Sequence, residues 1–414
     1  MQKFPVSLFQ GSDAQRQFFA ILLILMMLAP TISIAATIQS SSPPPGRSAQ
    51  QDPQQVAVKS CINGTNSLRP TILRVAFVAP TFTLTPYANF KHSFYEFYIK
   101  YKLSDYRITT DLNWLRTRVV VVGNWSSPAV NDEQPLHRFL TSDVASKCGL
   151  VMGQNLKMID DVGVHQGVLF VGSVRQYDVL ILGHEEYATR AEYNQLKHFV
   201  ASGGRIVMMS GNTFWAEVNY TKSTGIETFV AGHGFEFNGA YAWRSTYEPF
   251  DRESMGWFGS AFAMGTPRLH GAIVNDVSHI GQAMKSLFHR DLAFTNYSYP
   301  HNEVNYLGNF TNTQVIARFY VANAIGDSNF KMPLLPVDSY AHRYIKGEVV
   351  CLCVFGENLI SRDPEAQFFL VYATIYGSGM LPVPGCSSPF PGYCWHIGPR
   401  TAGFRFVDGF LAAS

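Results

Sequence analysis

The stretch YDVLILGHEEY, residues 177–187, places ionisable side chains directly after an apolar run. Imidazole, carboxylate and phenol groups can transfer protons or bind a metal, and an oxygen-rich set suits iron better than zinc. His184 and Tyr187 are three residues apart, so they would share a face if a helix began there. Two plainer explanations exist. Glu185 and Glu186 could favour a helix N-terminus through its dipole, and His184 could be a hydrogen-bonded histidine at the rim of the sheet.

No thiol or hydroxyl group occupies the place where a glutaminase-like or hydrolase elbow carries its nucleophile. The turn after the apolar run reads GHEE, residues 183–186, whereas such an elbow holds Cys or Ser in a tight turn after the strand. Thr189 comes too late and suits a helix N-cap. The sequence therefore favours proton transfer or metal chemistry here over a covalent intermediate.

Other histidines, carboxylates and tyrosines could complete a metal site with this stretch. They lie in the segments GHGFEF and YPHNEVNY, and the candidates are His233, Glu236, His301, Glu303 and Tyr306. Short strings of the H-x-E type are common in proteins, so spacing alone leaves the metal site one alternative among several.

The sequence predicts alternating strands and helices around these residues, and these elements must position the candidate side chains. Apolar runs predict strands at 71–80, 155–161, 177–183 and 205–211, and helical spacing predicts helices from Phe90, Gln134 and Thr189. Glu192 makes a capping box with Thr189, and Gly203 with Gly204 ends that helix. This alternation predicts an α/β fold, a parallel sheet with helices on both faces. Ligands bind beyond the carboxyl ends of such strands, where residues 184–187 lie.

The pattern changes after Gly211 and returns near the C-terminus. Residues 212–310 are rich in aromatic side chains and show strand and turn signals without clear helices, which predicts an irregular β-rich insertion. Its aromatic side chains could stack on sugars or line an apolar pocket, but core packing explains them equally. A strand from Gly347 and a helix from Asp363 then predict that the α/β domain, residues 70–414, resumes.

The N-terminus predicts export. Residues 1–36 combine basic residues, the apolar run FFAILLILMMLA and small residues after it, as secretory signals do; an uncleaved membrane anchor is the alternative. Residues 37–69 are rich in Ser, Pro and Gln and predict a solvated linker. Acceptor motifs for N-glycosylation occur at Asn63, Asn124, Asn219, Asn296 and Asn309. We therefore expect a secreted or cell-surface glycoprotein.

The six cysteines and the low charge narrow the classes further. Cys386 and Cys394 flank a turn-rich loop and form the best predicted disulfide, while Cys351 and Cys353 could be two core thiols or could reach Cys61 and Cys148. The sequence contains no C-x-x-C pair, the spacing that would indicate a zinc site. A net charge of +2, with scattered basic residues, argues against a nucleic-acid partner and leaves a small-molecule substrate. A membrane contact would come only through an uncleaved N-terminal segment, and the sequence sets no oligomeric state.

Residues 177–218 resemble the C-terminal domain of the beta (large) subunit of N,N-dimethylformamidase. The shared features are an apolar strand, a turn of the form H-x-E-Y, a helix, a Gly-Gly stop, a second strand and then G-N-x-F. The whole chain is also similar to secreted proteins of ammonia-oxidising archaea that carry this domain. The resemblance implies a flavodoxin-like sheet of the class I glutamine-amidotransferase-like type that lacks the amidotransferase cysteine.

The resemblance also implies a chemistry. The family enzyme hydrolyses a small amide at a mononuclear iron held by two tyrosines and a glutamate. Tyr187 matches the motif tyrosine, and His184 and Glu186 match the H-x-E positions before it, which implies that these two handle protons. Glu303, with His301 beside it, is chosen as a further ligand on chemistry and not on the motif.

Three functions follow from these patterns. The first is a metal-dependent hydrolase of a small linear amide. The second is a non-catalytic cell-surface glycoprotein that uses the same fold as a binding module, because one fold hosts many functions. The third is a sugar-binding or sugar-cleaving protein with an aromatic cleft.

Overall fold

The computed structural model describes residues 73–88, 119–121, 133–232, 253–266, 272–275, 278–294, 302–307, 312–319, 336–354, 359–379, 404–407 and 410–413. These residues belong to one compact unit, Gln51–Ser414. The predicted signal segment 1–36, the linker 37–69 and the helix expected from Phe90 lie outside the described residues and stay predictions. None of the helices in the described ranges is long and apolar enough to cross a membrane.

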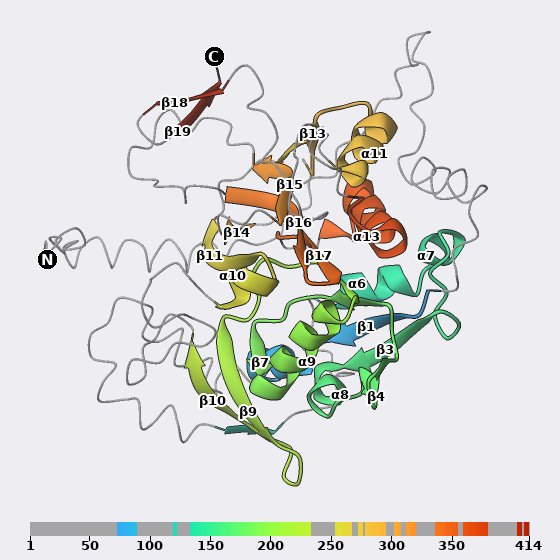
Figure 1. The fold of residues 1–414 in the computed structure, drawn as a ribbon, viewed down its shortest axis with the longest axis vertical. Coiled ribbons are helices and arrows are strands. Elements are labelled where there is room, and N and C mark those ends of the chain that lie inside the picture. The colour runs from blue at the N-terminus through green and yellow to red at the C-terminus, as the bar shows by residue number, and fades with distance from the viewer. Residues whose placement is uncertain are drawn as a thin grey trace, which may run out of the picture. The chain divides into compact units, whose positions relative to one another are not determined.

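Five parallel strands form the centre of the molecule (Figure 1). Their spatial order is β3-β1-β6-β8-β17, and each neighbouring pair is parallel. Strand-like runs predicted all five, and β1, β6 and β8 are the most continuously apolar because they are buried on both faces. Their bounds are β1 (Val75–Ala79), β3 (Leu156–Asp160), β6 (Val179–Leu182), β8 (Arg205–Met208) and β17 (Gly347–Leu352).

Helices cover both faces of this sheet, as predicted. Along β1, Val75 and Phe77 face one hydrophobic core while Ala76 and Val78 face the other. The first core is closed by α6 (Glu133–Leu140), α7 (Asp143–Lys147), α11 (His279–Phe288) and α13 (Pro364–Tyr376). The second is closed by α3 (Thr81–Ala88), α8 (Asp161–His165) and α9 (Arg190–Ala201).

The two ends of α9 follow the predicted signals. The Thr189 hydroxyl accepts from the Glu192 amide at 3.1 Å, and the Glu192 carboxylate accepts from the Thr189 amide at 3.2 Å. This reciprocal capping box satisfies two amide donors at the helix start. Gly203 follows the helix with φ at +102°, a left-handed conformation that favours glycine. The single helix expected from Gln134 is instead two, because Ser142 caps a new helix, α7.

The sheet continues beyond β17 with antiparallel strands. They pair in the order β17-β16-β15-β12-β13, and β14 pairs with both β11 and β16. Four of these come from the middle segment predicted as an insertion, so part of that segment belongs to the main sheet. The bounds are β11 (Ser260–Thr266), β12 (Ala272–Val274), β13 (Leu292–Ala293), β14 (Asn302–Leu307), β15 (Thr313–Phe319) and β16 (Pro336–Tyr344).

The expectation of no clear helix in the middle segment was wrong. It contains α10 (Glu253–Trp257) as well as α11. The cap on α11 is Ser278, whose hydroxyl accepts from the Gly281 amide at 3.1 Å. A side chain at Gly281 would meet the Asn275 carbonyl oxygen at 1.9 Å. The glycine needed for this close approach weakens the helical signal in the sequence.

A second, smaller sheet lies beside α9. Its order is β2-β10-β9-β7, with β7 parallel to β9 and the other pairs antiparallel. The bounds are β2 (Val119–Val121), β7 (Tyr187–Thr189), β9 (Ala216–Thr221) and β10 (Ile226–Gly232). Two hairpins complete the described strands: β4 (Phe170–Val171) with β5 (Val174–Arg175), and β18 (Phe404–Val407) with β19 (Phe410–Ala413).

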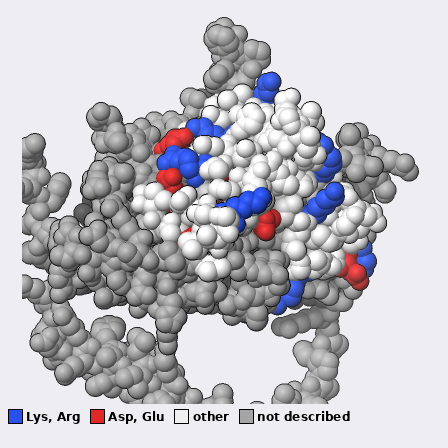
Figure 2. Space-filling view, turned by 90° about the horizontal axis from the view of Figure 1, so that it is seen from below, with Lys and Arg blue, Asp and Glu red and all other residues white. Residues whose placement is uncertain are grey.

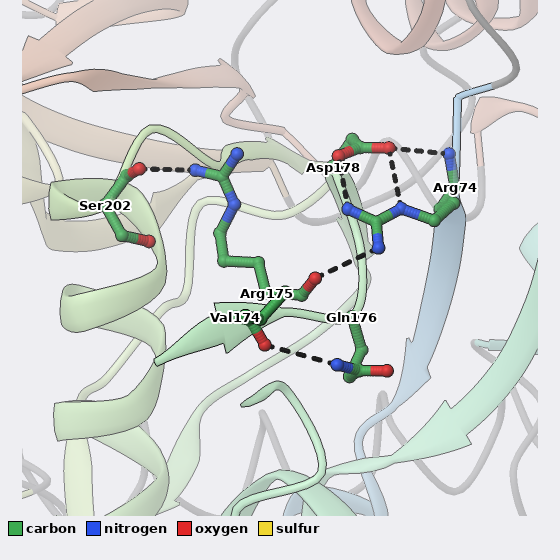
Figure 3. A network of polar contacts seen from close by, with 6 residues as sticks. All are labelled: Arg74, Val174, Arg175, Gln176, Asp178 and Ser202. Atoms are coloured by element: carbon green, nitrogen blue, oxygen red, sulfur yellow. Dashed lines mark hydrogen bonds and ion pairs between the residues drawn. The ribbon is translucent and has the colours of Figure 1, made fainter. Parts of the chain in front are cut away.

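A polar network joins the amino ends of β1 and β6 (Figure 3). The Arg74 guanidinium donates to both carboxylate oxygens of Asp178, at 3.1 and 2.8 Å, and also to the Arg175 carbonyl at 3.0 Å. Arg175 in turn donates to the Ser202 carbonyl at the end of α9, at 2.6 Å. The bidentate geometry fixes the two strands against each other and against α9.

Charges on the described surface are mixed. On the face in Figure 2, Lys and Arg side chains are scattered among uncharged ones, with Asp or Glu beside several of them. Among the ion pairs of the described residues, Lys197 and Glu253 lie 2.6 Å apart at the surface. Pairs of this kind contribute about 0–1 kcal/mol each to stability, so they do not decide the fold.

Cys351 and Cys353 form a disulfide with each other, and their Cα atoms are 5.3 Å apart. Neither arrangement considered from the sequence, two thiols or bonds to Cys61 and Cys148, matches this. Alternate residues of a strand point to the same side, which brings the two sulfurs together inside the core. Cys148 is also disulfide-bonded. Cys386 and Cys394 lie outside the described residues, so their pairing stays a prediction.

Candidate functional site

Residues 183–186 follow β6 at the carboxyl edge of the parallel sheet, as the strand prediction required. The idea that His184 and Tyr187 share the first turn of a helix was wrong. Tyr187 begins β7 and pairs with Ala216 of β9, and α9 starts only at Arg190. The amides of residues 214–216 donate to the carbonyls of Glu185 and Glu186. These bonds hold the segment extended, so it cannot be helical.

Glu186 is the centre of a group of polar side chains at this edge. Its Oε2 atom lies 3.1 Å from His184 Nε2, and the Tyr87 hydroxyl donates to the same oxygen. The Asn212 side-chain amide lies 3.4 Å from His184 Nε2. His184, Glu186 and Asn212 are 5, 1 and 7% exposed, and Tyr87 is partly buried. A buried carboxylate in contact with an imidazole and a phenol can accept, hold and return a proton.

Three strand ends bring this group together. Tyr87 lies on α3, which follows β1; His184 and Glu186 follow β6; Asn212 follows β8. Because β1, β6 and β8 are parallel neighbours, their carboxyl ends share one edge. The sequence analysis did not single out Tyr87 or Asn212. Only the order of the strands reveals that Tyr87 meets Glu186 and that Asn212 meets His184.

Tyr187 is fully buried next to this group. Its ring packs edge-on against the Tyr87 ring, with centroids 6.3 Å apart, and the Tyr87 ring lies 5.8 Å from that of His184. The Tyr187 amide donates to the Thr83 hydroxyl at 3.0 Å. Two phenols, a carboxylate and an imidazole are thus gathered within one small region.

The remaining predicted ligands and modification sites lie on other elements or outside the described residues. Glu303 lies on β14 opposite Gly265 of β11, in the large sheet, while Tyr187 belongs to the small sheet. The side chain of Glu303 and all of His301 lie outside the described part of the chain. Asn219 is exposed on β9, as a glycan acceptor must be. Asn63, Asn124, Asn296 and Asn309 lie outside the described residues.

A second cluster, of carboxylates, lies close to the first. Oxygen atoms of Asp161, Glu185 and Glu192 all lie within 4.8 Å of one another, and the three side chains are fully buried. Burial raises the pKa of Asp161 well above its usual range, and the charge of Glu185 raises it further. Burial, followed by the charge of Asp161, likewise raises the pKa of Glu192. The sequence assigned Glu192 only its capping role and missed this cluster, because its members lie on different elements and only the fold brings them together.

One comparison with known proteins confirms the family resemblance. A model of the family described as N,N-dimethylformamidase beta subunit-like, C-terminal, matches residues 54–272, which is more than half of the 414 residues. No curated protein matches the chain in sequence.

Solved structures are matched only loosely. A β-galactosidase from Bacillus circulans sp. alkalophilus is 12% identical with a TM-score of 0.35, and the match covers 74% of this chain and 31% of that one. An exo-β-1,4-mannosidase from Opitutaceae bacterium strain TAV5 is 12% identical with a TM-score of 0.34, over 76% and 37% of the two chains. A ThuA-like protein from Parabacteroides merdae ATCC 43184 is 11% identical with a TM-score of 0.27, over 61% and 88%. The chain spans about a third of the length of these two glycosidases, and such TM-scores support no functional argument.

Proposed function

The chain belongs to the N,N-dimethylformamidase beta subunit-like, C-terminal family, and from this premise we propose that it hydrolyses a small linear amide without a cysteine nucleophile. The observation that carries the proposal is the double contact at Glu186 Oε2, which meets both the Tyr87 hydroxyl and the His184 ring. A carboxylate held in this way can take a proton from an attacking water, with no covalent intermediate.

The order of the parallel strands also supports a site at the carboxyl edge of the sheet. Numbered in chain order, the five parallel strands run 2-1-3-4-5, the order of flavodoxin-like sheets. We infer from this order that the fold is flavodoxin-like. In such sheets the ligand binds where the strand order reverses, beyond the carboxyl ends of the first and third strands. Those strands are β1 and β6; Tyr87 lies on α3, which follows β1, and Glu186 follows β6.

Each side chain in the group has a proposed role. Glu186 accepts the proton of water, and His184 shares that proton and returns it to the leaving amine. Asn212, beside His184 Nε2, orients the imidazole ring. The burial of His184 and Glu186 keeps bulk water from competing for these contacts.

The iron that the family implies is compatible with the donors at this edge. The phenols of Tyr87 and Tyr187, the Glu186 carboxylate and the His184 imidazole form a hard, oxygen-rich donor set of the kind that ferric iron accepts. We propose Tyr187 as a ligand beside Tyr87, whose ring lies 6.3 Å from its own, while Glu186 and His184 handle protons. Glu303 and His301 are the further ligands that the sequence predicts. When bound, the metal would polarise the amide carbonyl and supply hydroxide.

An optical spectrum tests the metal site. The purified protein, loaded with ferric iron, is expected to be coloured, because iron bound by a tyrosinate absorbs visible light. Tyr187→Phe removes the phenolate and is expected to bleach or shift that band, while Tyr372→Phe on α13 leaves it unchanged. The measurements are metal analysis and a visible spectrum of the three proteins. A wild-type protein that stays colourless and metal-free after iron reconstitution would contradict the proposal.

We also propose that the chain is exported. The signal-like segment 1–36 supports this, as do the exposed acceptor Asn219 and the disulfide between Cys351 and Cys353, because disulfides persist mainly in oxidising compartments. Intact-mass analysis of the protein from its native host is expected to show a shortened chain that carries glycans. A full-length chain without glycans would contradict both expectations.

A further inference from the structure

Glu227 places a carboxyl side chain on an otherwise apolar, buried face of the small sheet, where burial raises its pKa well above the usual range. On the same face, Phe229 of β10 is buried, and so are Ala216 and Val218 on β9. The Glu227 side chain is fully buried, and neither of its oxygens has a hydrogen-bond partner among the described residues. Burying an ionised carboxylate in this way costs several kcal/mol unless another charge compensates it.

Neighbouring contacts show where Glu227 points. Its cross-strand partner is Tyr220 on β9, and directly opposite residues of a pair project from the same face. The Tyr220 ring lies 5.3 Å from that of Phe82 and 5.4 Å from that of His165. The Phe82 amide donates to Asp161 Oδ2 at 2.7 Å. Glu227 therefore lies on the face of the small sheet that packs against Phe82 of α3 and His165 of α8, and its charge contributes to the raised pKa of both Asp161 and Glu192.

The cluster that Glu227 faces also has unused oxygen atoms. Asp161 Oδ2 accepts from Phe82 and Glu192 Oε2 accepts from Thr189, but Asp161 Oδ1 and Glu192 Oε1 have no hydrogen-bond partner in the described part of the chain. None of the ion pairs between described residues includes Asp161, Glu192 or Glu227. A buried set of oxygen atoms with so little positive charge is the environment that a hard cation binds.

We propose that Asp161, Glu185 and Glu192 bind a hard divalent cation, with Glu227 as the fourth carboxylate around it. Oxygens bound to one Ca²⁺ at about 2.3–2.6 Å can lie up to about 5 Å apart. The three ligand oxygens lie within 4.8 Å of one another, which fits that limit. The set contains only oxygen donors, which favours Ca²⁺, Mg²⁺ or Mn²⁺ over softer metals.

Such an ion would join four elements. Asp161 begins α8 after β3, Glu185 lies between β6 and β7, Glu192 lies in the first turn of α9, and Glu227 lies on β10. Glu185 directly precedes Glu186, and the Glu185 carbonyl accepts from the Phe214 amide at 2.7 Å. The ion would therefore fix the segment that carries Glu186. This role does not depend on the proposed amide hydrolysis.

Metal binding to the full chain tests the proposal. The protein is stripped with EDTA and titrated calorimetrically with CaCl₂, MgCl₂ and MnCl₂, and its thermal midpoint is measured with and without each ion. We expect one ion per chain, with a higher midpoint when the ion is bound. Glu227→Gln and Asp161→Asn keep the side-chain shape but remove a charge. Each is expected to weaken binding about tenfold or more, because affinity follows the number of charged ligands.

Glu217→Gln is the matched control. Glu217 lies on β9, next to β10, but on the alternate face, where it pairs with Arg190 at 2.6 Å. The control is expected to bind the ion as the wild type does. Two results would overturn the proposal: a stripped wild-type protein that neither binds any of the three ions nor changes its thermal midpoint, or a Glu227→Gln variant with wild-type affinity. The first result would mean that the carboxylates share protons and bind no cation. It would leave the visible spectrum that depends on Tyr187 unchanged, so each proposal can be overturned without the other.

Discussion

Replacing Glu186 with glutamine is expected to lower kcat/KM for a small amide about 10²–10⁴-fold, the usual contribution of a general base. Glutamine keeps the size of the side chain but cannot accept a proton. Its contacts with Tyr87 and His184, which now meet at one carboxylate oxygen, would be shared between a carbonyl and an NH₂ group. N,N-dimethylformamide is the first substrate to use, with release of dimethylamine as the measurement.

The control for this substitution is Glu253→Gln. Glu253 is an exposed carboxylate at the start of α10 that pairs with Lys197. Its loss is expected to leave kcat/KM within about twofold, because exposed ion pairs contribute little. If Glu186→Gln keeps more than half of the wild-type activity, Glu186 is not the base. If the iron-loaded wild type cleaves no small linear amide, the proposed reaction itself is wrong.

Acidification from pH 7.5 to pH 4 is expected to lower the free energy of unfolding by about 3 kcal/mol through the titration of His342 alone. Burial lowers the pKa of His342 from 6.5 to about 4, an effect that a contact with the Gly256 backbone partly opposes. The ring is 2% exposed, and its Nδ1 atom lies 2.7 Å from the Thr313 hydroxyl. Because the folded pKa lies below the unfolded one, this stability is present above pH 6.5. It is lost as the pH falls toward 4, because the unfolded chain binds a proton at His342 more tightly than the folded chain does.

Urea unfolding at both pH values measures this contribution. His342→Gln removes the titrating ring, so the variant is expected to lose about 3 kcal/mol less than the wild type over the same interval. The substitution changes packing at every pH, and for this reason only the difference between the two pH values is informative. Equal losses in the two proteins would show that His342 does not titrate in this range.

The local signals of the sequence predicted much of the central sheet. Five strand-like runs became β1, β3, β6, β8 and β17, and the signal was clearest for β1, β6 and β8, which are buried on both faces and need no polar positions. The capping box at Thr189 and the glycines after α9 set the ends of that helix correctly. Helix α11 escaped prediction because Gly281, which the Asn275 carbonyl requires, weakens its helical signal. The antiparallel extension from β16 to β13 depends on pairing between distant residues, and no local pattern encodes it.

The candidate site was predicted only in part. The segment 184–187 was found because an apolar strand ends directly before it. Its partners Tyr87 and Asn212 lie about 100 and 30 residues away along the chain, and they meet it only through the order β1-β6-β8. Asp161 and Glu227 were overlooked for the same reason. A carboxylate is an ordinary surface residue in a sequence, and it becomes informative only once it is seen to be buried.

The Arg74–Asp178 network has a consequence for how such a protein can change over evolutionary time. It ties β1, β6 and the end of α9 together at the sheet edge opposite Glu186. Loops at the carboxyl edge can therefore be exchanged, lengthened or recombined while the frame beneath them keeps its alignment. For directed evolution, libraries that randomise the segments after β1, β6 and β8 but preserve the Arg74–Asp178 pair should retain the highest share of folded members.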